Sequence, residues 1–319
     1  MEGFGVLRAS IGLCGMLIFL ASMAAGAAES RPSAADPFDP GKARGAVISS
    51  LACLDDPDQS YALYLPSKYS PERAWPILYV FDPSAEGDVP VRLYEKVAER
   101  YGTILAASNN SRNGPFEPAM AAAQAGWSDS HHRLSIDAKR VYAMGFSGGA
   151  RFATTFALGC GTCRVAGVIA QGAGFPAGTK VETPRFAYFA AVGNADFNLP
   201  EILELRRTLD RQEAAFKVEV FEGRHDWAPP EVLDDALAWM SLKAMQAGIV
   251  PSDPVLIRQL FEQTRSQASE AEMKGAPLGQ YYALRSLVAD FQGIEGVSME
   301  YTWGDAKAPD RRSTQYFEM

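Results

Sequence analysis

The sequence predicts an α/β fold with a mainly parallel sheet and helices on both faces. Between residues 60 and 247, apolar runs alternate with segments of helical spacing, an order that favours parallel strands joined by helices. One apolar run leads directly into a glycine-flanked serine and then into a helical segment, which indicates a strand–turn–helix unit. With 319 residues, 47% of them hydrophobic, the chain can bury a substantial core.

The expected elements follow this alternation along the chain. Strands are expected at 60–65, 76–81, 103–107, 141–144, 165–170, 186–192 and 217–221, with helices at 91–101, 120–134, 151–158, 201–215 and 231–247. Strand signals vanish from residue 251 onward, and two amphipathic helices are expected at 255–272 and 279–291. These two helices form a C-terminal extension that either packs on the α/β unit or serves self-association.

The N-terminal segment has the pattern of a signal peptide. Arg8 precedes an apolar run at 11–21, and small residues at 25–27 suit cleavage, whereas the run is short for a membrane span. An uncleaved anchor is the alternative. We expect a signal peptide at 1–27, a Pro-rich linker at 28–45, the α/β domain at 46–247 and the helical extension at 248–319. The mature protein would be periplasmic or secreted, without a stable membrane span.

Charge and cysteine content narrow the classes of partner. The formal net charge is −8 and no basic cluster stands out, so no nucleic-acid partner is expected. Export leaves Cys53, Cys160 and Cys163, for which an oxidising compartment favours one disulfide and one free thiol without deciding the pairing. No second Cys or His pair accompanies Cys160 and Cys163, so no metal site is expected.

The motif with the clearest chemical meaning is Gly145-Phe146-Ser147-Gly148-Gly149, directly after the apolar run at 141–144. In a G-x-S-x-G turn the serine lies on a sharp bend, so that its hydroxyl projects from the top of the sheet beside a helix N-terminus. The flanking glycines let the helix pass close to the strand. We therefore predict that Ser147 is a nucleophile.

A serine nucleophile needs a base, and His225 is the candidate. The chain has three histidines, of which His225 alone lies after Ser147, in the loop leaving the strand at 217–221. A surface or helix-capping histidine is the alternative. His131 and His132, like Trp127, fall on a predicted helix, where packing is the expected role.

The base in turn needs a carboxylate to orient it. Asp196 follows the strand at 186–192 and is the preferred candidate, with capping of the next helix as its alternative role. Asp210 falls in the middle of that helix. Asp226 is adjacent to the histidine, so its side chain would face away from the imidazole ring. The resulting order, Ser147, Asp196 and His225, places each residue at the end of a strand.

An oxyanion formed on Ser147 would need two N–H donors. The first expected donor is Gly148, the residue after the nucleophile. The second would come from the loop after the strand at 76–81, where Pro83 has no N–H, so that Ser84 or Ala85 must serve and Ser84 is preferred.

Three further residues are expected to line the substrate site. Asn109 and Asn110 follow a middle strand and either contact substrate or form a plain turn, and Trp227 lies in the histidine loop. The connection between the two late strands, at 175–184, is too short for a lid domain. An open site of this kind fits bulky or oligomeric esters.

Taken together, the Gly145–Gly149 turn, the Gly193–Phe197 turn and the Gly223–Trp227 loop resemble the α/β-hydrolase superfamily. The approach Asp137–Gly145 is similar to secreted esterases of the polyhydroxybutyrate-depolymerase and feruloyl-esterase group. The resemblance covers residues 60–247 and implies an α/β-hydrolase fold without a lid.

The resemblance implies hydrolysis of carboxylic esters through an acyl-enzyme, with a Ser147–Asp196–His225 triad and no cofactor. Those esterases usually carry His-Gly at the oxyanion loop, where this chain has Asp82 and Pro83. A prolyl-oligopeptidase-like peptidase and a catalytically silent hydrolase fold used for binding are the alternative functions.

Overall fold

The computed structural model describes residues 38–159, 163–176, 178–179 and 183–294, together with the backbone of 298–300 and 316–318. The expected signal peptide at 1–27 lies outside these residues. The compact unit begins at Phe38. Among the described residues, no helix combines the length and the apolarity needed to cross a membrane.

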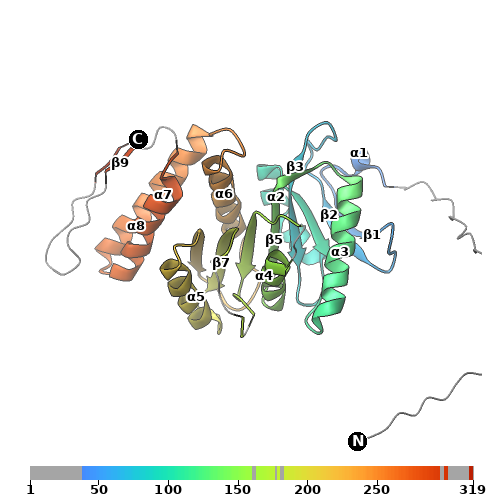
Figure 1. Ribbon diagram of the computed structural model, residues 1–319, viewed down its shortest axis with the longest axis horizontal. Helices are drawn as coiled ribbons and strands as arrows, with labels where there is room; N and C mark the ends of the chain where they lie inside the picture. Colours follow the sequence, from blue (N-terminus) through green and yellow to red (C-terminus); the bar gives the residue numbers. More distant parts are fainter. Residues whose placement is uncertain are drawn as a thin grey trace, which may run out of the picture. The chain divides into compact units, whose positions relative to one another are not determined.

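Eight strands form one sheet in the order β1-β2-β4-β3-β5-β6-β7-β8 (Figure 1). They are β1 (Val47–Ala52), β2 (Ser60–Tyr64), β3 (Trp75–Phe81), β4 (Ile104–Ser108), β5 (Ile136–Phe146), β6 (Gly167–Gln171), β7 (Ala187–Gly193) and β8 (Phe216–Phe221). Strand β2 is antiparallel to both of its neighbours, and the other pairs are parallel. This order is that of an α/β-hydrolase fold, so the predicted fold class is confirmed.

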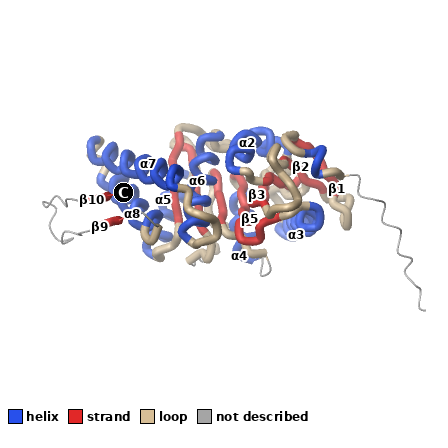
Figure 2. Tube along the Cα trace, turned by 90° about the horizontal axis from the view of Figure 1, so that it is seen from above, coloured by secondary structure: helices blue, strands red, loops and turns tan. Residues whose placement is uncertain are grey.

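Helices cover both faces of the sheet. Helices α2 (Asp88–Tyr101) and α6 (Pro230–Gln246) lie on one face, and α3 (Phe116–Arg133), α4 (Gly148–Gly159) and α5 (Leu199–Arg211) lie on the other (Figure 1). Figure 2 shows the strands between these helical layers. Strands β3, β4, β6 and β7 are buried along their whole length, as expected of parallel strands covered on both faces.

Strand β3 shows how one strand supplies both cores. Tyr79 and Phe81 pack with the residues of α3, α4 and α5, whereas Leu78 and Val80 pack with those of α2 and α6. Successive side chains of a strand point to opposite faces, so each face receives every second residue. A strand covered by helices on both faces therefore needs apolar residues at consecutive positions, and β3 has them.

Helices α7 (Pro254–Met273) and α8 (Pro277–Phe291) pack on each other and on α6. Asp253 caps α7 by accepting hydrogen bonds from the N–H groups of Val255 and Leu256, with Pro254 in the first turn. The shared apolar core, called here the α6–α7–α8 seam, consists of Ala238, Leu242, Ile257, Leu260, Phe261, Leu287, Phe291 and Ile294. Of the two roles left open for the extension, the structure shows packing on the α/β unit.

Several elements differ from the sequence-based expectations. Helix α1 (Pro40–Ala43), with Ala43 buried, lies within the segment expected to be a linker. Strand β1 was not expected, because its side chains are exposed or half-buried without a regular pattern. Strands β9 (Ser298–Glu300) and β10 (Tyr316–Glu318) pair antiparallel in a region where no strand was expected.

The cysteines take different states. Cys53 is a free, buried thiol, and burial raises its pKa to about 12. Cys163 is disulfide-bonded, and its partner lies outside the described residues. Cys53 therefore takes no part in that disulfide.

Candidate functional site

Ser147 lies on the turn between β5 and α4 and has a φ angle of 53°, which a non-glycine residue rarely adopts. Its N–H donates to the carbonyl oxygen of Gln171 at the end of β6, at 2.8 Å. A Cβ atom on Gly145 would overlap the backbone of Gly149, and one on Gly149 would overlap the carbonyl of Phe81. The glycines thus allow the close approach of strand and helix that holds Ser147 in this strained turn.

Ser147, His225 and Asp196 form one hydrogen-bonded chain. The Ser147 Oγ atom lies 2.9 Å from His225 Nε2. His225 Nδ1 lies 2.9 and 3.0 Å from the two carboxylate oxygens of Asp196. With the proton on Nδ1, the imidazole donates to Asp196 and its Nε2 accepts the Ser147 O–H. The structure thus brings together the three residues that the sequence places at separate strand ends.

The loops that carry the acid and the base are joined to each other. The N–H of Ala195 donates to the Gly223 carbonyl oxygen at 2.9 Å, and a Cβ atom on Gly193 would overlap the same oxygen. Asp196 Oδ1 also accepts the N–H of Asn198 at 2.8 Å. The carboxylate therefore contacts the imidazole and also holds the turn before α5, whose N-cap residue is Asn198 and not Asp196.

Two phenylalanines flank the imidazole ring of His225. The ring of Phe146 lies 4.7 Å from it and that of Phe197 lies 4.2 Å from it, measured between centroids. Phe197 is 73% exposed, so an apolar surface faces solvent directly beside the base. Phe197 was not among the expected site residues, although its place immediately after Asp196 in the sequence was a usable signal.

The other candidate acids and histidines have different partners. Asp226 Oδ1 accepts the N–H of Trp227 at 2.7 Å, and Asp210 accepts the hydroxyl of Tyr281 at 2.9 Å. His131 stacks on Trp127, with centroids 4.3 Å apart, and lies 2.8 Å from the carbonyl oxygen of that residue. This is the packing role expected of it.

The expected second oxyanion donor is already hydrogen-bonded within its own loop. The N–H of Ser84 donates to Asp82 Oδ1 at 2.7 Å, and that of Ala85 donates to the Asp82 carbonyl oxygen at 3.2 Å. Both donors are therefore used within their own loop, which corrects the choice of Ser84. Gly148 lies in the first turn of α4, where N–H groups have no intrahelical acceptor.

A small hollow of about 20 Å³ lies beside Gly148, with Asp82 and Asn113 in its lining. This volume is about that of one water oxygen. The side-chain amide of Asn113 lies so close to Gly148 that a Cβ atom there would overlap it. We call this space the oxyanion hollow after its position beside Gly148, the expected first donor, although neither Ser147 nor His225 is part of its lining.

Two of the three residues expected to contact substrate form hydrogen bonds with the protein backbone instead. The Asn109 amide donates to the Ser49 carbonyl oxygen at 3.1 Å, and the Asn110 amide donates to that of Asp58 at 3.0 Å. Both side chains thus hold the β1–β2 end of the sheet, which corrects their assignment as lining residues. The residue of this loop that reaches Gly148 is Asn113.

Trp227, the third expected contact, donates from its indole Nε1 to Asp82 Oδ2 at 3.0 Å. Its ring packs against Tyr94 and Phe146, with centroids 5.9 and 5.6 Å away. The structure thus places Trp227 in contact with the loop after β3, and its ring packs against Phe146, whose ring lies beside His225.

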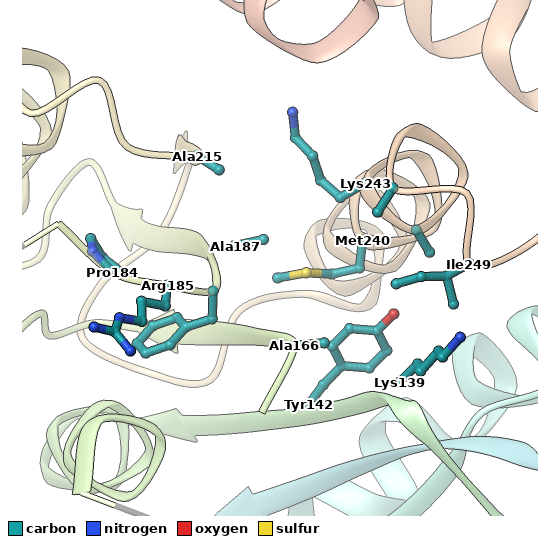
Figure 3. Close-up of a pocket in the computed structure, with 13 residues that line it drawn as sticks. Lys139, Tyr142, Ala166, Pro184, Arg185, Ala187, Ala215, Met240, Lys243 and Ile249 are labelled. Atoms are coloured by element: carbon teal, nitrogen blue, oxygen red, sulfur yellow. The ribbon is translucent and has the colours of Figure 1, made fainter. Parts of the chain in front are cut away.

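A larger pocket, of about 290 Å³, lies elsewhere (Figure 3). Tyr142 of β5 and Met240 of α6 line it, together with Ala166 and Arg185 just before β6 and β7. It therefore lies toward the amino ends of the parallel strands, whereas Ser147 follows the carboxyl end of β5, the edge at which such sheets bind ligands. Within the described ranges, no group of three or more His, Cys, Asp and Glu residues is arranged to hold a metal ion.

No protein-family model matches the chain, and no curated protein matches it. Among solved structures, the chain is similar to an S-formylglutathione hydrolase from Staphylococcus aureus (16% identity, 57% of this chain and 90% of that chain, TM-score 0.46). It is also similar to esterase LipW from Mycobacterium marinum (17% identity, 61% and 82% coverage, TM-score 0.47). A mutant feruloyl esterase module from Clostridium thermocellum, complexed with sinapinate, has 15% identity, 65% and 92% coverage and a TM-score of 0.49.

These TM-scores lie below 0.5. The fold is therefore assigned from the strand order of the sheet, and the candidate site is assigned from the distances between its side chains. The sheet order, the strained turn at Ser147 and the strand-end positions of Asp196 and His225 belong together in one architecture. The chain has an α/β-hydrolase fold with a hydrogen-bonded Ser–His–Asp arrangement at the carboxyl edge of its sheet.

Proposed function

We propose that the protein is a serine hydrolase that cleaves carboxylic esters through an acyl-enzyme. The observation that carries this proposal is the continuous chain of hydrogen bonds from Ser147 through His225 to Asp196, with distances of 2.9 Å on both sides of the imidazole. A serine hydroxyl becomes a strong nucleophile when a base takes its proton during attack.

In the first half of the reaction, Ser147 Oγ bonds to the ester carbonyl carbon while its proton passes to His225 Nε2. The carbonyl electron pair moves onto the oxygen, which accepts a hydrogen bond from the Gly148 N–H beside the oxyanion hollow. When the carbonyl re-forms, the bond to the alcohol oxygen breaks, and His225 returns the proton to the leaving alcohol. Asp196 stabilises the imidazolium that exists between these two steps.

In the second half, a water molecule attacks the acyl-enzyme and His225 takes its proton. Collapse of the second tetrahedral intermediate releases the acid and returns the proton to Ser147. The Asn113 amide can turn its NH₂ group toward the hollow and serve there as a second donor, since side-chain amides fulfil this role in other hydrolases.

The surroundings of Ser147 favour bulky or oligomeric esters. In the described part of the connection between β6 and β7, no helix is inserted as a lid. Phe197 adds an exposed apolar surface beside His225, on which a large acyl or alcohol group can rest. Such a surface does not require the substrate to be enclosed.

Labelling with a fluorophosphonate probe tests the proposal directly. The folded protein should be labelled, and Ser147→Ala should abolish labelling and lower ester hydrolysis by about 10⁴–10⁶-fold. Circular dichroism of the variant provides the control for folding. Absence of labelling in the folded wild type would favour the catalytically silent fold instead.

A substrate panel then separates the esterase from the peptidase alternative. Short-chain p-nitrophenyl esters, feruloyl esters and hydroxybutyrate oligomers would be compared with proline-containing peptides. We expect ester turnover to exceed peptide turnover, because the chain offers no gating domain in its described part and has an open site. Preferential cleavage of the peptides would contradict the esterase assignment while leaving the nucleophile in place.

A further inference from the structure

Asp82 is a buried carboxylate that joins two loops of the candidate site. It is 5% exposed. Its Oδ1 atom accepts the N–H groups of Ser84 and Glu86, at 2.7 and 3.2 Å, within the loop that follows β3. Its Oδ2 atom accepts the indole N–H of Trp227, from the histidine loop, at 3.0 Å. These three donors compensate the carboxylate for its loss of water.

The two ends of this link lie where catalysis needs a fixed geometry. Asp82 lines the oxyanion hollow, and Trp227 lies two residues after His225. The histidine loop is held again one residue later, where the N–H of Ala228 donates to Gln171 Oε1 at 2.9 Å. The backbone carbonyl of that same Gln171 accepts the Ser147 N–H.

We propose that the Asp82–Trp227 hydrogen bond is a positioning link that sets the oxyanion hollow relative to the imidazole of His225. This inference rests on the proposed hydrolase function. The nucleophile, the base and the oxyanion donors must keep their separations within a fraction of an ångström, because a misplacement of about 1 Å can cost about 100-fold in rate. A direct bond between the two loops provides that constraint.

The link specifically requires a carboxylate, because all three of its partners are donors. In Asp82→Asn, an amide oxygen that accepts from Ser84 and Glu86 leaves the NH₂ group facing the indole N–H of Trp227. The flipped amide instead directs its NH₂ group at the two backbone donors. In either orientation the NH₂ group of the introduced amide faces an N–H group. Because two donors cannot form a hydrogen bond with each other, the two loops must move apart.

Trp227→Phe removes the indole N–H and keeps an aromatic ring against Phe146 and Tyr94. In the double variant Asp82→Asn/Trp227→Phe, the amide introduced at position 82 would no longer face an opposing donor across the link. We therefore expect the second substitution to restore part of what Asp82→Asn removes, which a merely destabilising substitution would not do.

The experiment measures kcat and KM for p-nitrophenyl acetate, the rate of fluorophosphonate labelling and the Tm of the wild type, both single variants and the double variant. Asp82→Asn should lower kcat and the labelling rate about tenfold or more with KM unchanged, because the loss falls on the transition state. The double variant should be at least about threefold faster than Asp82→Asn.

Trp75→Phe is the matched control. Trp75 also donates from its indole N–H, to the Ser70 carbonyl oxygen at 2.8 Å, and lies in the core away from Ser147. It should lower Tm and leave kcat unchanged below the transition, whereas Trp227→Phe should lower kcat about threefold or more under the same conditions. This comparison tests the link even where Asp82→Asn does not fold.

Wild-type kcat in folded Asp82→Asn, equal kcat values in the two Trp variants, or rate losses that simply multiply in the double variant would each overturn the inference. These outcomes in a wild type that the probe labels at Ser147 leave the proposed function intact. A folded wild type without labelling would instead overturn the proposed function and, with it, this inference.

Discussion

The carboxyl edge of the sheet and the α6–α7–α8 seam differ in the kind of contact that dominates each of them. At the sheet edge, loops from four strands are joined by directional bonds to buried polar groups, among them Asp82 and Asp196. In the seam, most of the buried contact is made by apolar side chains such as Leu260 and Phe261, whose ring meets Phe291 edge-on at 5.3 Å. An ion pair between Lys243 of α6 and Asp290 of α8, at 2.8 Å, lies beside them. Polar bonds fix relative positions, whereas apolar burial supplies stability without fixing atoms to the same precision.

The difference indicates where each region is sensitive to substitution. We expect substitution of a polar group at the sheet edge to cause a large loss of rate and a modest loss of stability. An apolar group in the seam should show the opposite pattern. Substitutions in each region, with rate and stability both measured, test that separation.

Among the substitutions that compare these two regions, Asp196→Asn should have the largest effect. The amide cannot hold His225 with its proton on Nδ1 and stabilise the imidazolium, so kcat should fall by about 10⁴-fold. Steady-state hydrolysis of p-nitrophenyl acetate measures this loss. Because Asn can still accept the N–H of Asn198 with its amide oxygen, the Tm should fall by only a few degrees. A variant with nearly full activity would show that Asp196 is not the orienting acid.

The seam should respond to Phe261→Ala with a loss of stability rather than of rate. Phe261 is 2% exposed, and its truncation leaves a cavity between α7 and α8, so unfolding should become easier by about 3–5 kcal/mol. Urea denaturation measures the change, and kcat per folded molecule should stay at the wild-type value. Val255→Ala, at a 76% exposed position on the same helix, is the control and should change stability by less than about 0.5 kcal/mol. A fall in kcat with unchanged stability would contradict the separation of the two regions.

The same contrast explains which features the sequence could predict. The strands at 76–81 and 186–192 and the turn at Ser147 depend on local patterns, so their positions follow from the residues themselves. The Ser84 N–H donates to the Asp82 carboxylate, which also accepts the indole N–H of Trp227, 145 residues away along the chain. No local pattern encodes that contact.

Strand β1 and the Asn109 amide follow the same rule. Strand β1 is half-exposed and is a strand because it pairs with β2. The Asn109 amide donates a hydrogen bond to the backbone carbonyl of Ser49 in β1. Both depend on partners from other elements. Helices α7 and α8 were predictable as amphipathic segments, whereas the surface of α6 on which they pack was not.

The smallest effect is expected from Glu219 of β8, a carboxyl group close to the junction of the sheet with α6. Burial, together with the carboxylate of Asp235 on α6, raises the pKa of Glu219 to about 7, while Lys217 acts in the opposite direction. Because the pKa is higher in the folded than in the unfolded state, the folded state is favoured with the group protonated. The stability that the protonated Glu219 carboxyl contributes to the folded state is fully present below pH 4.5 and is lost as the pH rises through about 7.

Glu219→Gln removes this charge while keeping the shape of the side chain. We expect the variant to be more stable than the wild type by about 1–2 kcal/mol at pH 8 and the difference to shrink toward zero at pH 4. Urea denaturation at the two pH values measures it, with Glu272→Gln at an exposed position of α7 as the control. Equal changes in the free energy of unfolding of both variants would attribute the effect to net charge. A change at pH 8 in Glu219→Gln alone would show that the charge of Glu219 destabilises the junction between the sheet and α6.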